Sequence, residues 1–273
     1  MADYESMRIE RDGAIAEVVL VGPGKGNAMG PAFFRDLPLA FAALDKDDGV
    51  RAVIVRGDKG VFTYGLDLRT MAGELVPHLQ KGNLAAERTK LLDLIGELQR
   101  GFELVARCRK PVIAAVAGAC IGGGVDLISA CDVRLASRDA KFSVREVKIA
   151  IVADLGTLQR LPRIVGQGHA RELALTGKDI DAERAARIGL VNDVYADEAE
   201  LLAAARAMAR EIAENPPLAV QGIKQVMGHG DERAVLEGKR FNAVWNAAFL
   251  ASNDLVEAMQ AFMEKRPPKF DGT

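Results

Sequence analysis

The 273-residue chain has little of what metal-binding and disulfide-stabilised proteins need. It contains three cysteines, Cys108, Cys120 and Cys131, and three histidines. The cysteines show neither a Cys-x-x-Cys pair nor the Cys/His spacing of a zinc site, so we expect buried free thiols rather than a redox pair. The histidines share no motif, and we expect no metal site.

Long apolar runs and an excess of one charge are also missing. The longest charge-free run, residues 111–125, has 15 residues and contains four glycines, which is too short and too rich in glycine for a membrane span. The 36 basic and 38 acidic residues nearly balance, so the composition indicates no nucleic-acid or acidic-membrane partner. With 49% hydrophobic and 27% charged residues, we expect a soluble globular protein.

The two ends of the chain carry no recognisable targeting signal. Residues 1–13 read MADYESMRIERDG and lack an apolar signal core. The last three residues, DGT, do not match a peroxisomal address. We therefore expect a cytoplasmic protein of a bacterial kind.

Strand-like and helix-like patterns alternate through the first part of the chain. Strands are expected at residues 14–21, 51–56, 111–116 and 132–136, and helices at 31–45, 84–107 and 125–130. This alternation is typical of an α/β layered core. Later residues are mainly helical, with helices expected at 201–213, 217–227 and 232–265. We predict an α/β core at residues 1–195 and a C-terminal helical region at 196–273.

Two glycine-rich segments follow predicted strands. The first, residues 21–30, reads VGPGKGNAMG and fails the usual nucleotide patterns, because Lys25 is followed by glycine and the third glycine comes one residue early. A plain strand-to-helix turn is an equally good interpretation. The second, residues 118–126, reads GACIGGGVD and places three consecutive glycines before a helix. Free amides there would bind an oxygen that becomes negative, unless the glycines only allow tight packing.

Two acids lie in apolar surroundings further along the chain. Glu146 precedes a run of aliphatic residues, and Asp154 follows that run eight residues later. A buried carboxylate is unfavourable unless another group pairs with it or the protein uses it. Caps or surface salt bridges explain either acid alone, whereas a functional pair explains both.

Four segments occur together and in order: KGNAM, FTYGLDL, KPVIAAVAGACIGGGVDL, and VREV followed by ADLGTLQRLPR. This combination resembles the enoyl-CoA hydratase/isomerase (crotonase) superfamily over nearly the whole chain. The resemblance implies an α/β fold, a crotonase-like spiral of ββα units with a helical C-terminal trimerisation region. It also implies an acyl-CoA thioester substrate, no separate cofactor because CoA is part of the substrate, and self-association to a trimer or hexamer.

The same resemblance assigns binding residues by position. The amides of Leu66 and Gly123 would form an oxyanion hole for the thioester carbonyl. Residues expected near CoA are Lys25, Gly26, Asn27, Ala28, Tyr64, Gly65 and Asp67. Tyr64 stands where the family usually has a small residue, so we expect a difference in pocket shape or entry; Asp67 alternatively caps a following helix.

The acids decide between branches of the family. Glu146 and Asp154 match the acid/base pair of the dienoyl-CoA isomerases, and Asp126 would orient or tune that pair. The resemblance thus implies movement of the double bonds of a 3,5-dienoyl-CoA to the 2,4-isomer in fatty-acid β-oxidation, through a stabilised enolate. Hydratases carry glutamates at the positions of Asp126 and Glu146, so addition of water to a 2-enoyl-CoA is the alternative. A non-catalytic acyl-CoA binder is a third hypothesis.

Overall fold

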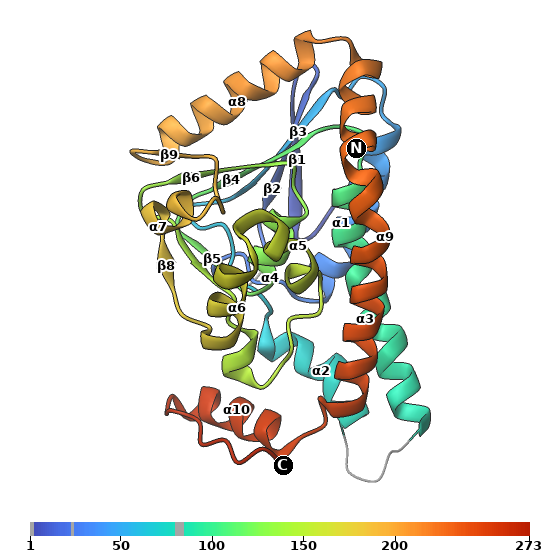
Figure 1. Ribbon diagram of the computed structural model, residues 1–273, viewed down its shortest axis with the longest axis vertical. Coiled ribbons are helices and arrows are strands. Elements are labelled where there is room, and N and C mark those ends of the chain that lie inside the picture. Colours follow the sequence, from blue (N-terminus) through green and yellow to red (C-terminus); the bar gives the residue numbers. More distant parts are fainter. Residues whose placement is uncertain (1–2, 23–24, 80–84) are drawn as a thin grey trace.

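The computed structural model describes residues 3–22, 25–79 and 85–273 (Figure 1). Its larger sheet has the strand order β1 (Met7–Asp12), β2 (Ile15–Leu20), β3 (Ala52–Gly57), β4 (Val112–Val116), β6 (Val133–Ser137) and β9 (Asp193–Tyr195). β1 and β2 form an antiparallel pair, and every other neighbouring pair in this sheet is parallel. A smaller sheet joins β5 (Ala119–Ile121), β7 (Lys141–Ser143) and β8 (Ile180–Asp181).

Helices surround both sheets. They are α1 (Pro31–Lys46), α2 (Leu68–Leu79), α3 (Ala85–Arg107), α4 (Gly123–Ser129), the 3-10 helix η1 (Glu146–Ile149), α5 (Thr157–Val165), α6 (Gln167–Thr176), α7 (Ala182–Arg187), α8 (Glu198–Glu214), α9 (Pro217–Phe249) and α10 (Asn253–Glu264). Figure 1 shows α8 across one end of the molecule, α10 at the opposite end, and α9 running between them beside α3.

The inner strands β2, β3 and β4, and the second half of β6, are buried on both faces because alternate side chains point to opposite layers. Ile54 and Ile113 pack with Leu201 of α8. Their neighbours Val55 and Ala114 belong to the other core layer, which includes residues of α1 and α3. Such strands read as continuous apolar runs, so the four predicted strands are confirmed as β2, β3, β4 and β6.

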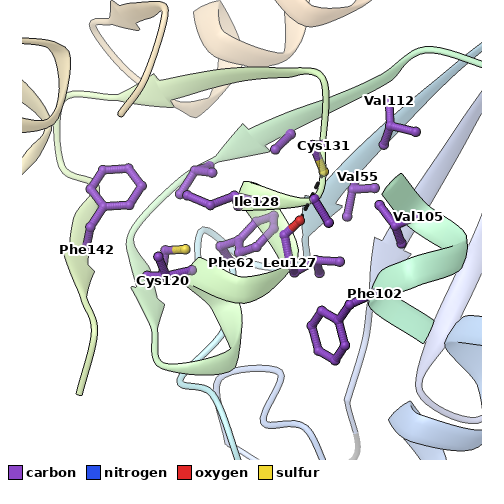
Figure 2. Close-up of a cluster of buried hydrophobic side chains, with 14 of the residues drawn as sticks. Val55, Phe62, Phe102, Val105, Val112, Cys120, Leu127, Ile128, Cys131 and Phe142 are labelled. Carbon is purple, nitrogen blue, oxygen red and sulfur yellow. Dashed lines mark hydrogen bonds between the residues drawn. The ribbon is translucent and has the colours of Figure 1, made fainter. Parts of the chain in front are cut away.

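The larger core also contains the three cysteines. Cys108, Cys120 and Cys131 are buried free thiols, as expected. Figure 2 shows Cys120 and Cys131 among apolar side chains, with the Cys131 thiol donating to the Leu127 carbonyl at 3.3 Å. Burial raises the pKa of the Cys131 thiol to about 12, which keeps it protonated and unreactive.

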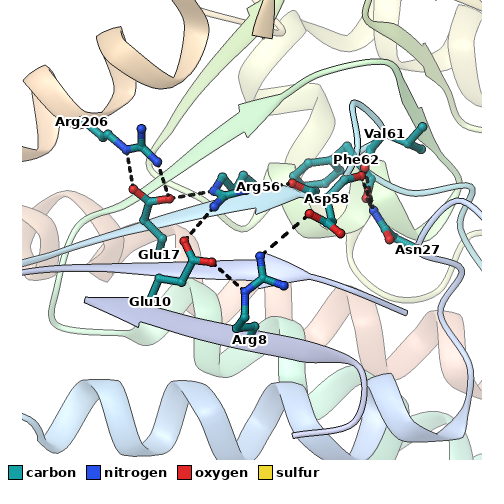
Figure 3. A network of polar contacts seen from close by, with 10 residues as sticks. Arg8, Glu10, Glu17, Asn27, Arg56, Asp58, Val61, Phe62 and Arg206 are labelled. Carbon is teal, nitrogen blue, oxygen red and sulfur yellow. Dashed lines mark hydrogen bonds and ion pairs between the residues drawn. The ribbon is translucent and has the colours of Figure 1, made fainter. Parts of the chain in front are cut away.

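A polar network ties α8 to the sheet (Figure 3). Glu17 of β2 is buried, and its carboxylate accepts hydrogen bonds from Arg56 at 2.7 Å and from Arg206 of α8 at 2.6 Å. Arg56 also pairs with Glu10 of β1 at 2.9 Å. Burial alone would raise the pKa of Glu17, but the two arginines outweigh burial and lower it. Together with Glu10, these residues connect β1, β2 and β3 to α8.

The C-terminal helices differ from the expected ones. α9 continues from Pro217 to Phe249, where the sequence predicts a break near residues 228–231, and α10 is a separate helix after Ser252. Glycines 228 and 230 weaken a helix but do not end one that is packed along α3 and α5. Ser252 caps α10 by accepting from the Leu255 amide at 3.1 Å.

The other expected helices are present as α1, α3, α4 and α8, although Leu84, at the expected start of α3, lies outside the described residues. β1, β5, β7, β8, β9 and α2 were not among the expected elements. The division of the chain at residue 195 stays a prediction.

Candidate active site

A cavity of about 1190 Å³ is lined by the β5–α4 turn, by the loop that follows η1 and by the C-terminal helices. Its basic lining residues are Lys25, Arg69, Lys141 and Arg145. Its apolar lining residues include Leu75, Ile95, Leu98, Leu250 and Phe262. The cavity therefore offers cationic groups and an apolar wall to one ligand.

The two amides expected to bind an oxyanion both belong to this cavity. Leu66 and Gly123 line it, and neither amide nitrogen donates a hydrogen bond to any described residue. Gly123 is the first residue of α4, so the positive end of a helix lies behind its amide. A Cβ on Gly65 would stand 3.5 Å from the Gly123 nitrogen, which places the two turns against each other.

Two glycines make these turns possible. Gly65 has φ +81°, and a Cβ there would lie 2.6 Å from the Ile121 carbonyl oxygen. Gly122 has φ 54° and ψ −118°, a combination that side chains other than glycine rarely adopt. A Cβ on Gly122 would lie 3.3 Å from Oε1 of Glu146, so this carboxyl group is adjacent to the amide turn.

The three acids singled out in the sequence meet in the cavity. Asp126, Glu146 and Asp154 all line it, brought from α4, η1 and the following loop. Asp126 Oδ1 accepts from the Thr157 amide at 2.6 Å. Asp126 Oδ2 and Glu146 Oε2 are buried and form no hydrogen bond with the described residues. Unpartnered buried carboxyl oxygens are unfavourable, and active sites are where proteins keep them.

Burial determines the electrostatics of these acids. Burial raises the pKa of Glu146 well above its usual range, and the neighbouring carboxyls of Asp126 and Asp154 raise it further. Burial also raises the pKa of Asp126, against the hydrogen bonding of Thr157. Burial raises the pKa of Asp154 to about 7, although a hydrogen bond from Asn246 acts in the opposite direction. The site thus holds Asp154, which can be protonated or ionised near neutral pH, beside two further carboxyl groups whose pKa values are raised.

The segment of residues 25–28 is only partly at the cavity. Lys25 and Ala28 line it, as do Tyr64, Gly65 and Asp67, whereas Gly26 and Asn27 are not among its lining residues. The Asn27 side-chain amide instead lies 2.7 Å from the Val61 carbonyl, and 3.3 Å from the carbonyls of Asp58 and Phe62 (Figure 3). Asn27 therefore holds the turn in place through its side chain.

Tyr64 and Asp67 have structural contacts as well. The Tyr64 amide donates to the Gly26 carbonyl at 2.9 Å, and the Tyr64 ring occupies the space that a Cβ on Gly26 would need. Half of the Tyr64 surface, 49%, is exposed. Asp67 accepts from the Arg69 and Thr70 amides at the start of α2, which confirms the expected helix cap.

The structure also adds residues that the sequence did not indicate. Asn246 of α9 donates to Asp154 Oδ2 at 2.6 Å. Lys239, also on α9, is 1% exposed and pairs with Glu103 of α3 at 2.7 Å. These residues lie in a uniformly helical part of the sequence, and no local motif could have linked them to an acid about 90 positions earlier.

The family model for enoyl-CoA hydratase/isomerase matches residues 10–273. The chain belongs to this family. The curated relatives include Delta(3,5)-Delta(2,4)-dienoyl-CoA isomerase, mitochondrial, of Dictyostelium discoideum, 45% identical over 99% of this chain and 92% of its own. The peroxisomal enzyme of the same name from Arabidopsis thaliana is 41% identical over 99% of this chain and 98% of its own. A probable enoyl-CoA hydratase of Rhizobium meliloti is 35% identical over 98% of both chains.

Solved structures of the family have the same fold. An enoyl-CoA hydratase/isomerase from Pseudoalteromonas atlantica superposes with a TM-score of 0.84 at 25% identity, covering 98% of this chain and all of its own. An enoyl-CoA hydratase from Bacillus anthracis gives a TM-score of 0.74 at 29% identity, over 98% of this chain and all of its own. The crotonase-like α/β fold expected from the sequence is thus confirmed.

The relatives contradict the expectation of a cytoplasmic, bacterial-type protein. The dienoyl-CoA isomerases that match at 40–45% identity are named as mitochondrial or peroxisomal proteins. The expectation relied on the residues at the two ends of the chain, and those residues do not decide the compartment. Within the described residues, no helix has the length and apolarity needed to cross a bilayer, and no group of His, Cys, Asp and Glu side chains could hold a metal ion.

Proposed function

We propose that the chain is a dienoyl-CoA isomerase that converts a 3,5-dienoyl-CoA to the 2,4-dienoyl-CoA. The observation that carries this proposal is the meeting of two free amides with Glu146 and Asp154 in one cavity. The names of the relatives from Dictyostelium and Arabidopsis support the same reaction. An acyl-CoA of this kind arises when unsaturated fatty acids undergo β-oxidation.

The amides of Leu66 and Gly123 bind the thioester carbonyl oxygen. When a base removes a proton from C2, negative charge moves onto this oxygen and an extended enolate forms. Amides that already point at the oxygen stabilise the enolate without reorganising, and loss of one such donor typically lowers the rate by about 10²–10³-fold.

Two acids are needed because the proton leaves from C2 and returns at C6. These carbons are about 5 Å or more apart, beyond the hydrogen-bond range of one fixed carboxyl group. One member of the pair Glu146 and Asp154 accepts the C2 proton as a carboxylate, and the other delivers a proton to C6 as a carboxylic acid. The step is balanced in protons and electrons and therefore needs no separate cofactor. CoA enters as part of the thioester substrate.

Asp126 tunes this pair rather than exchanging protons itself. Its carboxyl group is 1% exposed and is held by the Thr157 amide. Among the charged groups that act on Glu146, Asp126 has the largest effect, and it raises the pKa of Glu146. A raised pKa makes Glu146 hold its proton more readily than an ordinary glutamate does.

The polar part of the substrate occupies the part of the cavity that is lined by Lys25. Lys25, Ala28, Tyr64, Gly65 and Asp67 line the cavity beside the amide of Leu66 and form the CoA-binding part of the site. Lys25 supplies a cation for the CoA phosphates. Asn27 supports this part of the site through its side chain, which donates to carbonyl groups of the chain, and Gly26 through its carbonyl, which accepts from the Tyr64 amide.

The function is tested with a panel of thioesters. We expect purified protein to produce the conjugated 2,4-diene from a 3,5-dienoyl-CoA, followed by its ultraviolet absorbance, without incorporation of labelled oxygen from water. Efficient hydration of a 2-enoyl-CoA with no diene formation would favour the hydratase, a reaction that Asp126 and Glu146 could also support. Binding without any turnover would favour a non-catalytic acyl-CoA binder.

Two substitutions test the roles of the acids. We expect Glu146→Gln and Asp154→Asn each to lower kcat by about 10²–10⁴-fold while CoA-ester binding, measured by calorimetry, is largely retained. Glu237→Gln, on the exposed part of α9, serves as the control. Retained turnover in both active-site variants would refute the assignment.

The chain assembles into a trimer, or a hexamer made of two trimers, through α9. Phe241, Trp245 and Phe249 follow one another at helical spacing and are 68%, 46% and 60% exposed. The rings of Trp245 and Phe249 lie 4.7 Å apart and form a continuous apolar surface. Exposed apolar stripes of this kind mark subunit contacts. Sedimentation should give a trimer or hexamer for the native chain and smaller species for Trp245→Lys; a native monomer would contradict the proposal.

A further inference from the structure

The loop that carries Asp154 is held by three side-chain amides. Gln99 of α3 donates to the Asp154 carbonyl at 2.7 Å, and Asn242 of α9 donates to the Ala153 carbonyl at 2.5 Å. Asn246 of α9 donates to the Val152 carbonyl at 2.8 Å. The three amide residues are 6%, 5% and 2% exposed. Two helices distant in sequence thus determine where the loop lies.

Asn246 differs from the other two because it also contacts the Asp154 side chain. Its nitrogen Nδ2 lies 2.6 Å from Asp154 Oδ2. The orientation of the amide follows from its other contact, because the Val152 carbonyl can only accept a hydrogen bond and must face the nitrogen. Both hydrogens of this nitrogen are then engaged, and Asp154 Oδ2 is always an acceptor.

We propose that Asn246 is a positioning residue that assigns the exchangeable proton of Asp154 to Oδ1 and favours the ionised form of this carboxyl group. The carbonyl-type oxygen of a carboxylic acid is a better acceptor than the hydroxyl oxygen, so an amide that donates to Oδ2 favours placing the acid proton on Oδ1. Asp154 lines the cavity and its Oδ2 is engaged with Asn246, which leaves Oδ1 as the oxygen that exchanges protons with a substrate. The catalytic consequence rests on the proposed isomerase function; the effect on Asp154 does not.

Other charged groups also affect the pKa of the Asp154 carboxyl group. Asp126 of α4 raises its pKa and Lys239 of α9 lowers it. Glu146 of η1 interacts with the same carboxyl group. After burial, the hydrogen bond from Asn246 is the largest influence on the pKa of Asp154, and it acts to lower it. A hydrogen bond to a charged group is strong enough to shift a pKa by about one to two units.

The test compares Asn246→Leu with Asn242→Leu. Each variant removes one buried amide that holds the same loop, but only the first removes a contact with the Asp154 carboxyl. The readout is the pH titration of the carboxylic-acid infrared band, in which the contribution of Asp154 is identified by its loss in Asp154→Asn.

We expect the titration of Asp154 to move upward by about one to two pH units in Asn246→Leu and by less than about half a unit in Asn242→Leu. Asn246→Asp provides a second variant of the same shape, in which a neighbouring carboxyl group also raises the titration. An unchanged titration in the Asn246 variants, or an equal shift in Asn242→Leu, would overturn the proposal.

Kinetics separate this proposal from the proposed function. In an active isomerase, the pH limb of kcat that depends on Asp154 should move by the same amount as the infrared titration. If the native protein has no isomerase activity, the proposed function fails, while the infrared titration still decides the role of Asn246. A kinetic limb that stays in place while the infrared band moves would overturn the catalytic part of the inference.

Discussion

Replacement of Asp154 by asparagine should stabilise the protein at alkaline pH. The pKa of this carboxyl group is 3.8 in its ordinary state and about 7 in the folded protein, because the site is buried. The folded state therefore holds a proton between these two values that the unfolded chain releases. By linkage, stability from this group is fully present below pH 3.8 and is lost as the pH rises through about 7.

The size of the effect follows from the same two values. Between pH 5 and pH 9, the native protein should lose about 3 kcal/mol of stability from Asp154, because each of the roughly two pH units between pH 5 and the pKa of about 7 costs about 1.4 kcal/mol. Asp154→Asn removes this loss and keeps an oxygen that can accept from Asn246. Asp126 and Glu146 are present in both proteins, so most of their contribution cancels in the difference.

The assay is urea unfolding of both proteins at pH 5 and pH 9. We expect the stability of Asp154→Asn relative to the native protein to increase by about 3 kcal/mol between the two pH values, or by about 6 °C in Tm. Asp48→Asn, at an exposed position before β3, is the control and should show no such change. Equal pH dependence of the native protein and Asp154→Asn would refute the raised pKa.

Two further predictions concern the amide turn and the ion pairs. Gly65→Ala places a Cβ 2.6 Å from the Ile121 carbonyl, so we expect kcat to fall by about 10²–10³-fold, whereas Gly73→Ala, where a Cβ meets nothing within 4 Å, should leave kcat unchanged. Glu17→Gln removes the carboxylate shared by Arg56 and Arg206 and should lower the free energy of unfolding by about 2–3 kcal/mol in urea titrations; a loss below about 0.5 kcal/mol would contradict the importance of this network.

The strands of the larger sheet illustrate what local patterns can predict. β2, β3, β4 and β6 are short runs of β-branched and aliphatic residues, and a strand buried on both faces requires such a run. β9 could not be found in this way because it has only three residues, Asp193–Tyr195, none of them fully buried, which is too short for a pattern. It becomes a strand because β6 offers a free edge, which is a property of the assembled sheet.

The C-terminal helices show where local patterns fail because tertiary packing overrides them. The gap at residues 228–231 between two expected helices is not present in α9, because packing against α3 outweighs a local cost of about 1 kcal/mol for each of the glycines at 228 and 230. The position of α9 matters for the site, since it delivers Asn242, Asn246 and Lys239 to the acid loop.

The sequence by itself determined the family, the glycine turns and the three acids, because these depend on residue types that stand close together in the chain. Gly122 must be glycine for its backbone conformation, Glu146 and Asp154 are recognisable as acids in apolar surroundings, and the family resemblance adds Asp126. Only the tertiary structure decided how these acids ionise. Burial, and the amide of a helix about 90 residues away, set the pKa of Asp154, and neither exists until the chain has folded.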